Sequence, residues 1–403
     1  MKILVLAPRP LWPEHDGGTV ATARCVRGLA SAGAEITLLS IKTEKHNEAL
    51  ASAGSQLPPY LSAYRTVQVD TRIRPAAMAR NLLFSSEPYD MARFRSAAYS
   101  ERLREVLKNN HFDIIQCEGL TMALYLKEVR KLTDSPVILR AHNLEHKIRK
   151  MMAAAERSPV RKRYLANLSR RLLIAEKQAA AEFDAVVPIG EPDFRWFSDA
   201  AGGKPVSLSE TGAEAAVRLP EPPASPLRVG FIGSMNWSPN VEGIKWFINK
   251  VWPCVLEKIP SATLHIAGRG LQQNNNRLPH GNNIVVEGET DSAQDFIASN
   301  HVIISPLFAG SGLRIKIIEA MSAGRPVVAT PVAVEGLRAD NGRELAVAGD
   351  PESFCSALAS LLQDPKKRAD MGDAAVALVK QRYDNAANTA RLLEFYKSLT
   401  HDN

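Results

Sequence analysis

The sequence lacks the features that mark membrane-spanning, secreted and fibrous proteins. No stretch approaches the roughly 18–20 uninterrupted apolar residues that span a bilayer. The apolar start, residues 2–7, is too short for a secretory signal peptide and has no small-residue cleavage site behind it. With 24 Gly and 25 Pro among 403 residues, collagen-like and low-complexity chains are excluded as well. We therefore expect a soluble cytoplasmic protein of two or three domains, since a domain usually contains roughly 100–200 residues.

Cysteine is also scarce. The four cysteines, Cys25, Cys117, Cys254 and Cys355, are scattered along the chain and form no Cys-x-x-Cys pair. This spacing argues against a disulfide framework and against a structural zinc site. It predicts free thiols, which are typical of proteins in a reducing cytoplasm.

Positive charge is concentrated in the first half of the chain. Residues 1–223 contain 32 Lys and Arg against 25 Asp and Glu, whereas residues 224–403 contain 18 of each. The segment 145–182 alone carries ten basic and four acidic residues, and we expect it to form a long basic helix. The asymmetry indicates an anionic partner such as a membrane surface, a lipid phosphate or a nucleic acid, although a solvated helix face would explain it too. Because no nucleic-acid-binding module or aromatic–basic pattern is present, nucleic acid is not expected.

Strand-like runs alternate with helix-length segments in two series. Residues 219–227 separate the series and contain four prolines in nine residues, which indicates a linker because proline removes backbone donors and fixes φ. The expected strands are 2–7, 35–41, 113–116, 136–140 and 184–188 before the linker, and 228–233, 262–267, 284–287, 301–305 and 326–330 after it. Such alternation predicts parallel sheets with right-handed crossovers. The fold class is therefore α/β, with two Rossmann-like domains that face each other across a cleft.

The expected domain boundaries follow from the linker. Residues 1–223 form the first domain and residues 224–385 the second. The last segment, 386–403, is a C-terminal helix and a candidate to pack back on the first domain.

The most informative stretch is SPLFAGSGLRIKIIEAMSAGRPVVATP, residues 305–331. A strand ends here, the loop Gly310, Ser311 and Gly312 follows, and a helix begins near Leu313. Glycines let backbone N–H groups approach a phosphate closely, and the helix N-terminus adds partial positive charge. Loops at the carboxyl ends of strands are where open α/β sheets bind ligands.

Three charged residues follow this loop. Arg314 and Lys316 place two cations in the first turn of the helix, and the Glu319 carboxylate could accept hydrogen bonds from ribose hydroxyls. Together they indicate a nucleotide-diphosphate site. The alternative is an ordinary strand–helix turn with a surface pair of cations.

At these residues the chain resembles a known family. This stretch resembles retaining glycosyltransferases of the GT-B fold, closest to family 4. The resemblance rests on the glycine-rich loop, Lys316, the Glu-Ala-Met that begins at Glu319 and the Pro-Val-Val-Ala-Thr that follows. The segment VGFIGSMNWSPNVEGIKWF, residues 229–247, resembles the donor-side strand and loop of bacterial exopolysaccharide members. In the first domain, the expected loop Gly17–Gly18 and the strand-terminal residues 140–143 match in place and order. The resemblance spans nearly the whole chain.

The resemblance implies that the second domain binds a nucleotide sugar and the first an acceptor. Glu319 would be the second glutamate of the family's E-x7-E element and would hold the donor ribose, whereas Ser311 replaces the first glutamate. The family often places an Arg and a Lys in the loop after Gly233, where this chain has Ser234, Asn236 and Asn240 instead. Arg314 and Lys316 would then supply most of the charge that binds the diphosphate.

The resemblance also implies a wider donor site. Residues 286–290 would hold the base through backbone contacts, and Arg269 is a weaker candidate at another strand end. The implied donor-binding residues are Gly17, Gly18, Gly233, Ser234, Asn236, Asn240, Arg269, Gly288, Thr290, Gly310, Ser311, Gly312 and Leu313.

His142 is the candidate catalytic residue of the first domain, with Arg314, Lys316 and Glu319 in the second. It follows the strand 136–140, so it should point toward the ligand, and the resemblance implies a hydrogen bond to the donor sugar or a place near the acceptor. His146 is expected at the start of the basic helix. A structural role for His142 is the alternative.

The chemistry requires a stabilised leaving group more than a strong base. Fixed cations and N–H dipoles stabilise the departing nucleoside diphosphate. The sequence contains no Asp-x-Asp, the motif that metal-dependent GT-A transferases use for manganese, so no metal and no cofactor are expected. No convincing nucleophilic carboxylate is present either, so front-face attack with retention is preferred.

The segment RIRPAAMARNLLF, residues 72–84, bears on the acceptor. It mixes three arginines with large apolar residues, a composition suited to an interface with anionic lipid. With the basic segment 145–182, it suggests peripheral association with the inner leaflet, where a polyprenyl-diphosphate-linked sugar would be presented. The alternative is that its apolar side packs into its own domain.

The sequence thus predicts a cytoplasmic, peripherally membrane-associated GT-B glycosyltransferase. It would transfer a sugar from a nucleotide donor to a glycan or lipid-linked precursor of the cell envelope, such as an exopolysaccharide or lipopolysaccharide. A dehydrogenase is set aside because no G-x-G-x-x-G follows the first strand. A sugar-nucleotide epimerase of the same fold and an inactive nucleotide-sugar-binding subunit remain as alternatives.

Overall fold

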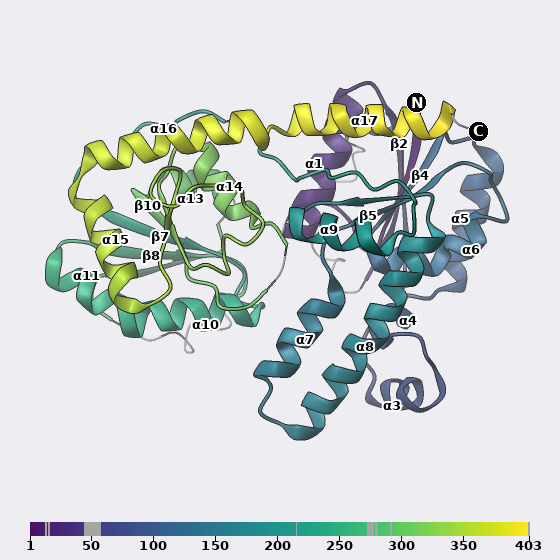
Figure 1. Cartoon of the computed structure of the whole chain (residues 1–403), viewed down its shortest axis with the longest axis horizontal. Helices are drawn as coiled ribbons and strands as arrows, with labels where there is room; N and C mark the ends of the chain where they lie inside the picture. The colour runs from purple at the N-terminus through teal and green to yellow at the C-terminus, as the bar shows by residue number, and fades with distance from the viewer. Residues whose placement is uncertain are drawn as a thin grey trace. The chain divides into compact units, whose positions relative to one another are not determined.

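The computed structural model divides into two compact units (Figure 1). It describes residues 1–12, 14, 17–43, 58–214, 216–271, 278, 281–290, 292–310 and 312–401. Unit 1 contains residues 1–211 and 386–403, and unit 2 contains residues 212–385. In the described part of the chain, no helix is long and apolar enough to cross a membrane.

Unit 1 is built on a six-stranded parallel sheet. Its strands are β1 (Lys2–Ala7), β2 (Glu35–Lys42), β3 (Ala63–Gln68), β4 (Ile114–Glu118), β5 (Val137–Ala141) and β6 (Ala185–Pro188). They lie in the order β3-β2-β1-β4-β5-β6. Successive residues of a strand point to opposite faces, so Leu4 enters one hydrophobic core and Val5 the other.

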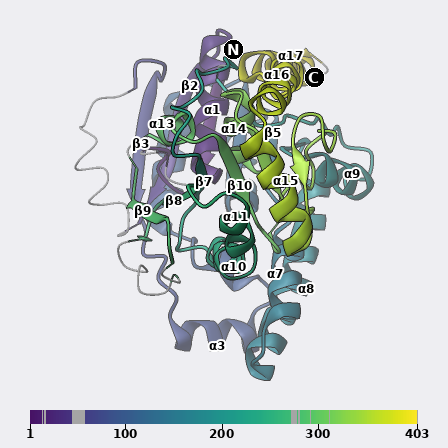
Figure 2. The ribbon, with the colours of Figure 1, turned by 90° about the vertical axis from the view of Figure 1, so that its left-hand side faces the viewer.

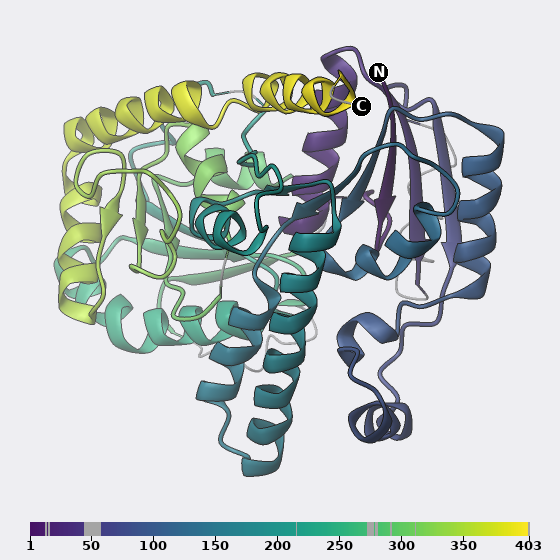
Figure 3. The same cartoon turned by 45° about the vertical axis from the view of Figure 1, so that its right-hand side comes forward.

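Helices cover both faces of this sheet (Figure 3). On one face lie α1 (Gly17–Ser31) and α17 (Asn385–His401). On the other lie α5 (Ala97–Asn109), η2 (Leu120–Tyr125), α6 (Leu126–Val129), α8 (Pro159–Glu182) and α9 (Glu191–Ala200). A sheet buried on both faces explains why its inner strands are almost uninterrupted apolar runs.

The basic segment 145–182 is a pair of helices, so the expected single helix was wrong. α7 (Glu145–Ala155) and α8 form a hairpin that projects from the sheet (Figures 1 and 3). Pro159 is the first residue of α8, and the ring of proline disfavours helical geometry at Ser158. α3 (Pro75–Phe84) and α4 (Tyr89–Ala92) connect β3 to α5, and the end of α3 lies beside α8.

Unit 2 repeats the architecture. Its strands are β7 (Arg228–Ile232), β8 (Thr263–Ala267), β9 (Ile284–Gly288), β10 (Val302–Ser305), β11 (Val327–Ala329) and β12 (Ala346–Val347), in the order β12-β11-β10-β7-β8-β9. On one face lie α10 (Ser238–Trp246), η3 (Phe247–Val251), α11 (Trp252–Lys258) and α15 (Pro351–Gln363). On the other lie α13 (Ala293–Ala298), α14 (Ile315–Ser322) and α16 (Pro365–Arg382). The expected pair of Rossmann-like parallel sheets is therefore confirmed.

The strand order places a ligand-binding position in each unit. In unit 1 the order reverses between β1 and β4, and in unit 2 between β7 and β10. The helices that follow neighbouring strands at such a point lie on opposite faces and leave room at the carboxyl ends of the strands, where doubly wound sheets bind ligands.

The chain passes into unit 2 before its proline-rich stretch. Ala213 N donates to Tyr383 O (2.8 Å), and Leu219 N donates to Ala323 O (3.0 Å). Arg325 Nη1 donates to Leu219 O (3.2 Å). These bonds tie residues 213–219 to unit 2, so part of the stretch expected to be a linker is anchored.

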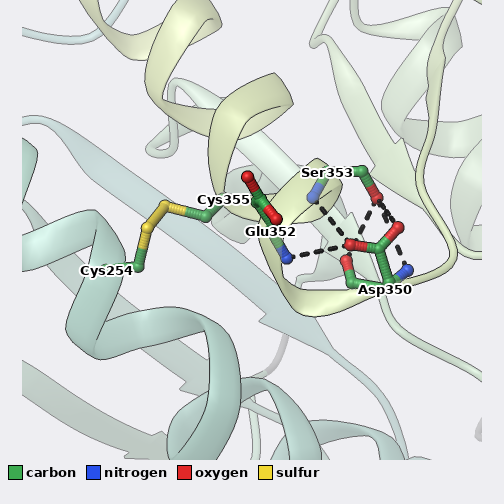
Figure 4. The surroundings of a disulfide bond; sticks show 5 residues. All are labelled: Cys254, Asp350, Glu352, Ser353 and Cys355. Carbon is green, nitrogen blue, oxygen red and sulfur yellow. Dashed lines mark hydrogen bonds between the residues drawn. A yellow bond between two sulfur atoms is a disulfide. The ribbon is translucent and has the colours of Figure 1, made fainter.

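Cys254 and Cys355 form a disulfide, so the prediction of four free thiols was wrong. The two residues are 101 positions apart, but α11 and α15 pack on the same face and bring their Cα atoms to 6.2 Å (Figure 4). Cys25 and Cys117 are free and buried. The sequence could not reveal the pair because it depends on helix packing and on no local spacing.

Candidate active site

The loop 306–314 leaves the sheet of unit 2 at its switch point. Gly310 and Gly312 have φ of +124° and +83°, a region that glycine adopts without strain. A Cβ at Gly310 would lie 2.7 Å from Arg314 Nη2 and 2.9 Å from the Trp237 ring. Glycine therefore lets both side chains lie against this loop.

Arg314 is held at the start of α14. It is 8% exposed, and its guanidinium carbon lies 5.8 Å from the centroid of the Trp237 ring. Nη1 donates to Gly312 O at 3.1 Å. The neighbouring Leu313 packs into the apolar core, so only its backbone can contribute to a site. Ser311 lies outside the described residues.

Lys316 points from the first turn of α14 toward the end of β7. Its Nζ donates to Ile232 O (3.3 Å) and to Asn240 Oδ1 (3.2 Å). It also lies 4.7 Å from the centroid of the Phe231 ring. Burial, and then the charge of Arg314, lower the pKa of Lys316 to about 7. The two cations are therefore close together, and each is partly removed from water.

Asn240 links Lys316 to the loop after β7. Its Nδ2 donates to Ser234 O (2.9 Å) while its Oδ1 accepts from Lys316. A Cβ at Gly233 would lie 2.8 Å from Asn240 Nδ2, so a larger residue there would displace this amide. Asn236 N donates to Ser234 Oγ at 3.3 Å. The structure thus brings these sequence-predicted donor residues together.

The remaining donor candidates lie at the carboxyl ends of β8 and β9. Met235 N donates to Arg269 O (2.8 Å), which joins this edge to the loop after β7. The Arg269 side chain itself is exposed and lies 4.0 Å from Glu289. Gly288 has φ of +87°, and Thr290 Oγ1 donates to a main-chain carbonyl two residues on. In the described part of unit 2, the side chain of Lys316 bonds to Ile232 and Asn240 and to neither Arg269 nor Thr290.

Glu319 lies on α14, one turn after Lys316. It is half-buried. Residues three apart lie on the same side of a helix, so its carboxylate and the ammonium of Lys316 share one side of α14.

Gly17 and Gly18 are the first residues of α1, so the expected loop was wrong at these positions. α1 begins at Gly17, and it follows β1 in the chain, so its first turn comes after the carboxyl end of that strand. Thr22 Oγ1 donates to Gly18 O at 3.1 Å. Glycine tolerates both helix and loop, so composition alone could not place the boundary.

His142 belongs to a buried polar cluster at the ends of β4 and β5. Its Nε2 lies 2.5 Å from Glu118 Oε2, which also accepts from Arg140 Nη1 (3.2 Å) and Thr22 Oγ1 (3.0 Å). Burial by itself would raise the pKa of Glu118, but Arg140 and His142 outweigh it and lower the pKa to about 2. The carboxylate is therefore ionised and accepts a hydrogen bond from the N–H at Nε2 of His142. This bond fixes the orientation of the imidazole ring.

The cluster extends to α17. Gln116 Nε2 donates to Glu118 Oε1, and Gln116 Oε1 accepts from Tyr396 Oη at 2.7 Å. Sequence reasoning missed Glu118 and Gln116 because the predicted strand ended at residue 116. A polar residue at the end of a buried strand, beside another strand that ends in Arg-Ala-His, is the signal that could have identified Glu118.

A second histidine–carboxylate pair follows directly. His146, at the start of α7 as expected, bonds through Nδ1 to Glu176 of α8. Ser169 Oγ donates to His146 O at 2.8 Å. This pair holds the base of the α7–α8 hairpin together. Across the described residues, no group of three or more His, Cys, Asp and Glu side chains could hold a metal ion.

Two Rossmann-like units, each with polar groups at its switch point, define a doubly wound α/β protein with a candidate ligand site in each unit. The family model of the glycosyl transferase 4-like domain matches residues 16–208, and that of glycosyl transferases group 1 matches residues 226–364. The chain therefore belongs to the glycosyltransferases, and its fold is GT-B.

Similar proteins agree with this assignment. A Klebsiella pneumoniae protein, described as an uncharacterized 44.6 kDa protein in the cps region, is 24% identical over 394 residues, which is 95% of this chain and 97% of that protein. Sucrose-phosphate synthase from Thermosynechococcus elongatus is 15% identical, with a TM-score of 0.74 and 100% of both chains covered. Anabaena HepE in complex with UDP-glucose is 13% identical, with a TM-score of 0.66 over 99% of this chain and 100% of that one. At these identities the two solved structures show the fold alone.

Proposed function

We propose that this glycosyltransferase moves a sugar from a nucleotide-diphosphate donor to a glycan or lipid-linked precursor of the cell envelope. Transfer retains the anomeric configuration and uses no metal. The observation that carries the proposal is the pair Arg314 and Lys316 at the start of α14, against the carboxyl end of β7.

This pair suits a departing diphosphate. When the glycosidic bond of the donor breaks, the bonding electrons go to the diphosphate oxygen, and negative charge develops there. Two fixed cations and the N–H groups of the glycine loop stabilise that charge without reorganisation. They supply the positive charge that a manganese ion supplies in other transferases, which supports metal-independent catalysis.

The state of Glu118 argues against a covalent intermediate on this residue during the proposed retaining transfer. This carboxylate is 1% exposed and accepts hydrogen bonds from Gln116, Thr22, Arg140 and His142. A group so engaged cannot act as a nucleophile toward a sugar carbon. Front-face attack, in which the acceptor hydroxyl forms the new bond on the side that the diphosphate leaves, needs no such nucleophile. The oriented His142 ring would then bind the donor sugar or the acceptor.

The class of donor and acceptor rests on similar proteins. HepE is described with UDP-glucose, which makes a UDP-sugar the first donor to test. The Klebsiella relative is encoded in a cps region, which favours a capsule or exopolysaccharide precursor over a soluble sugar. Such precursors are assembled at the cytoplasmic face of the inner membrane, and we place the enzyme there.

The decisive experiment compares nucleoside diphosphates as ligands. Calorimetric titration of the whole chain with UDP, GDP and dTDP, with and without magnesium, should give one tight binder whose affinity does not depend on the metal. Lys316→Met should weaken that binding about 10- to 100-fold, because a hydrogen bond from a charged donor contributes about 1.5–3 kcal/mol. Lys366→Met, an exposed lysine of α16, is the matched control and should bind as the wild type does.

The outcomes separate the alternatives. Binding of a nucleotide sugar without release of diphosphate in the presence of a membrane extract would indicate an inactive binding subunit. Interconversion of the sugar without an acceptor would indicate an epimerase. If no diphosphate binds, or if Lys316→Met and Lys366→Met behave alike, the donor site proposed here is wrong.

A further inference from the structure

Unit 1 exposes an apolar surface surrounded by arginine and lysine. It is formed by α3, by the residue Ile73 that precedes it, and by the α7–α8 hairpin, and we call it the lower surface of unit 1. We propose that this surface inserts into the headgroup region of an anionic bilayer. The inference deepens the proposed function, on which it rests for the presence of a lipid-linked acceptor.

α3 presents its large apolar side chains to solvent. None of its ten residues is buried. Leu83 and Phe84 are 73% and 83% exposed, and Ile73 is 64% exposed. Its partly covered side consists of Ala77, Met78 and Asn81, whereas the large side chains at its end face solvent. The sequence left open whether the apolar side of this segment packs into its own domain, and the structure shows that it does not.

The α7–α8 hairpin adds further apolar side chains. Val160, at the start of α8, is 78% exposed, and Met152 near the end of α7 is 44% exposed. Arg171 of α8 holds the end of α3 beside the hairpin, since its Nη1 donates to Asn81 O (3.2 Å) and its Nη2 to Leu82 O (2.7 Å). Figures 1 and 2 show α3 and the hairpin leaving the sheet in the same direction.

The exposed apolar side chains of unit 1 are concentrated here. Every large hydrophobic residue of its described part that is more than about a third exposed lies on this surface: Ile73, Leu82, Leu83, Phe84, Met152, Val160 and Ile174. A soluble protein rarely exposes such a concentration without a partner, and scattered single residues would need no explanation.

The charge of the surface favours anionic lipid as that partner. The tip of the hairpin, residues 156–163, carries Arg157, Arg161, Lys162 and Arg163 against the single acid Glu156. Beside α3, Arg72 and Arg74 share one acid, Asp70. Apolar residues that enter the headgroup region, flanked by cations that stay at its surface, are the arrangement by which peripheral proteins bind anionic leaflets.

Vesicle flotation of the whole chain tests the proposal. Vesicles of phosphatidylcholine alone are compared with vesicles that also contain phosphatidylglycerol. The wild type should partition about tenfold or more into the anionic vesicles. The double variant Leu83→Ser/Phe84→Ser should lose most of this binding at both low and high salt, because the two removed side chains bind the bilayer through apolar contacts that salt does not screen. Lys162→Gln/Arg163→Gln should weaken binding about fivefold per charge at low salt and much less at high salt.

Matched controls exclude general effects of surface substitution. Val217→Ser removes an apolar side chain that is 61% exposed in unit 2, and Lys250→Gln/Lys258→Gln removes two exposed charges there. Both should float as the wild type does. Nucleoside-diphosphate affinity, measured on every variant, should stay unchanged, which separates loss of the membrane surface from loss of the donor site.

Several outcomes would overturn the inference. One is that the wild type stays away from both kinds of vesicle while still binding its nucleotide. Another is that Leu83→Ser/Phe84→Ser floats normally. A third is that the wild type sediments as a dimer which this variant makes monomeric, since a second copy of the chain would then be the partner. If the protein binds vesicles as expected but binds no nucleotide, the proposed function is wrong, whereas the proposed membrane surface is supported.

Discussion

Burial gives Lys316 a pKa near neutrality, and this makes the donor site sensitive to pH. In the free protein its pKa is about 7, so above that pH the amine is mostly neutral. A bound diphosphate favours the ammonium form and raises the pKa again. Binding should therefore take up a proton whenever the pH lies above about 7.

The affinity for the nucleoside diphosphate should accordingly fall as the pH rises from about 7 to 9, by up to about tenfold per unit. Below about 7 the amine is already charged, and its contribution should level off. Calorimetry in buffers of different ionisation enthalpy measures both the affinity and the proton uptake. Lys316→Met should show a flat profile over this range. A flat profile in the wild type would contradict the assignment of Lys316 to the diphosphate.

The sequence could assign some residues to a site but not others. Arg314, Lys316 and Gly310 could be assigned to the proposed donor site because glycine, a strand end and a helix start are encoded within ten positions. Glu118 was missed, although it holds His142, because the two residues are 24 positions apart and meet only through the pairing of β4 with β5. The partner of Lys316, Asn240, was assigned to the donor site, but its bond to the amine depends on how α10 packs beside β10.

The element that positions the glycine loop is α10. Its Gly243 lies so close to the start of the loop that a Cβ there would be 1.9 Å from Pro306 O. A main-chain oxygen cannot rotate out of the way, so any larger residue must push α10 and the loop apart.

Gly243→Ala should therefore lower the free energy of unfolding by roughly 1–3 kcal/mol, as overpacking does. It should also weaken diphosphate binding, because Pro306 leads into the loop that carries Arg314. Urea denaturation and calorimetry measure the two effects. Gly349→Ala is the matched control, since its nearest neighbours would be at an ordinary 3.7 Å. Equal behaviour of the two variants would show that α10 does not position the loop.

Among the elements, most strands were predicted to within one residue at an end, including the edge strands β6 and β9. The expected strand at residues 2–7 has the bounds of β1, and β7, β8 and β10 differ by one residue at an end. β3 and β12 were missed because these two edge strands bury few residues, so their apolar pattern is weak. The hairpin α7–α8 was read as one helix because a basic, helix-forming composition continues across its turn.

At the scale of the molecule, the chain begins and ends in the same unit. α17 returns to unit 1, where Leu392, Leu393 and Tyr396 are buried in the core beside α1. A Cβ at Gly28 would lie 2.4 Å from Thr389 Oγ1, so glycine permits the close approach of α1 and α17. The last helix is thus part of the first unit's core.

Ending the chain after Asp384 should consequently destabilise unit 1, because each large apolar side chain of α17 contributes about 1.5–3 kcal/mol by burial. Hydrogen exchange should become faster in β1, β4 and β5, while β7 and β8 keep their protection. Removing only residues 401–403 is the control and should change neither unit. Loss of protection in both units together would show that they do not fold separately.

The sequence by itself determined the alternation of strands and helices and the family, and it predicted a phosphate-binding role for residues 305–331. These features depend on periodicity and turn chemistry, which are encoded within a few residues. The tertiary structure alone decided the bond between Cys254 and Cys355, the cluster of Glu118 and His142, and the outward-facing side of α3. Each of these depends on which distant segments pack together, and the free energy of that packing is spread over whole cores that no local pattern records.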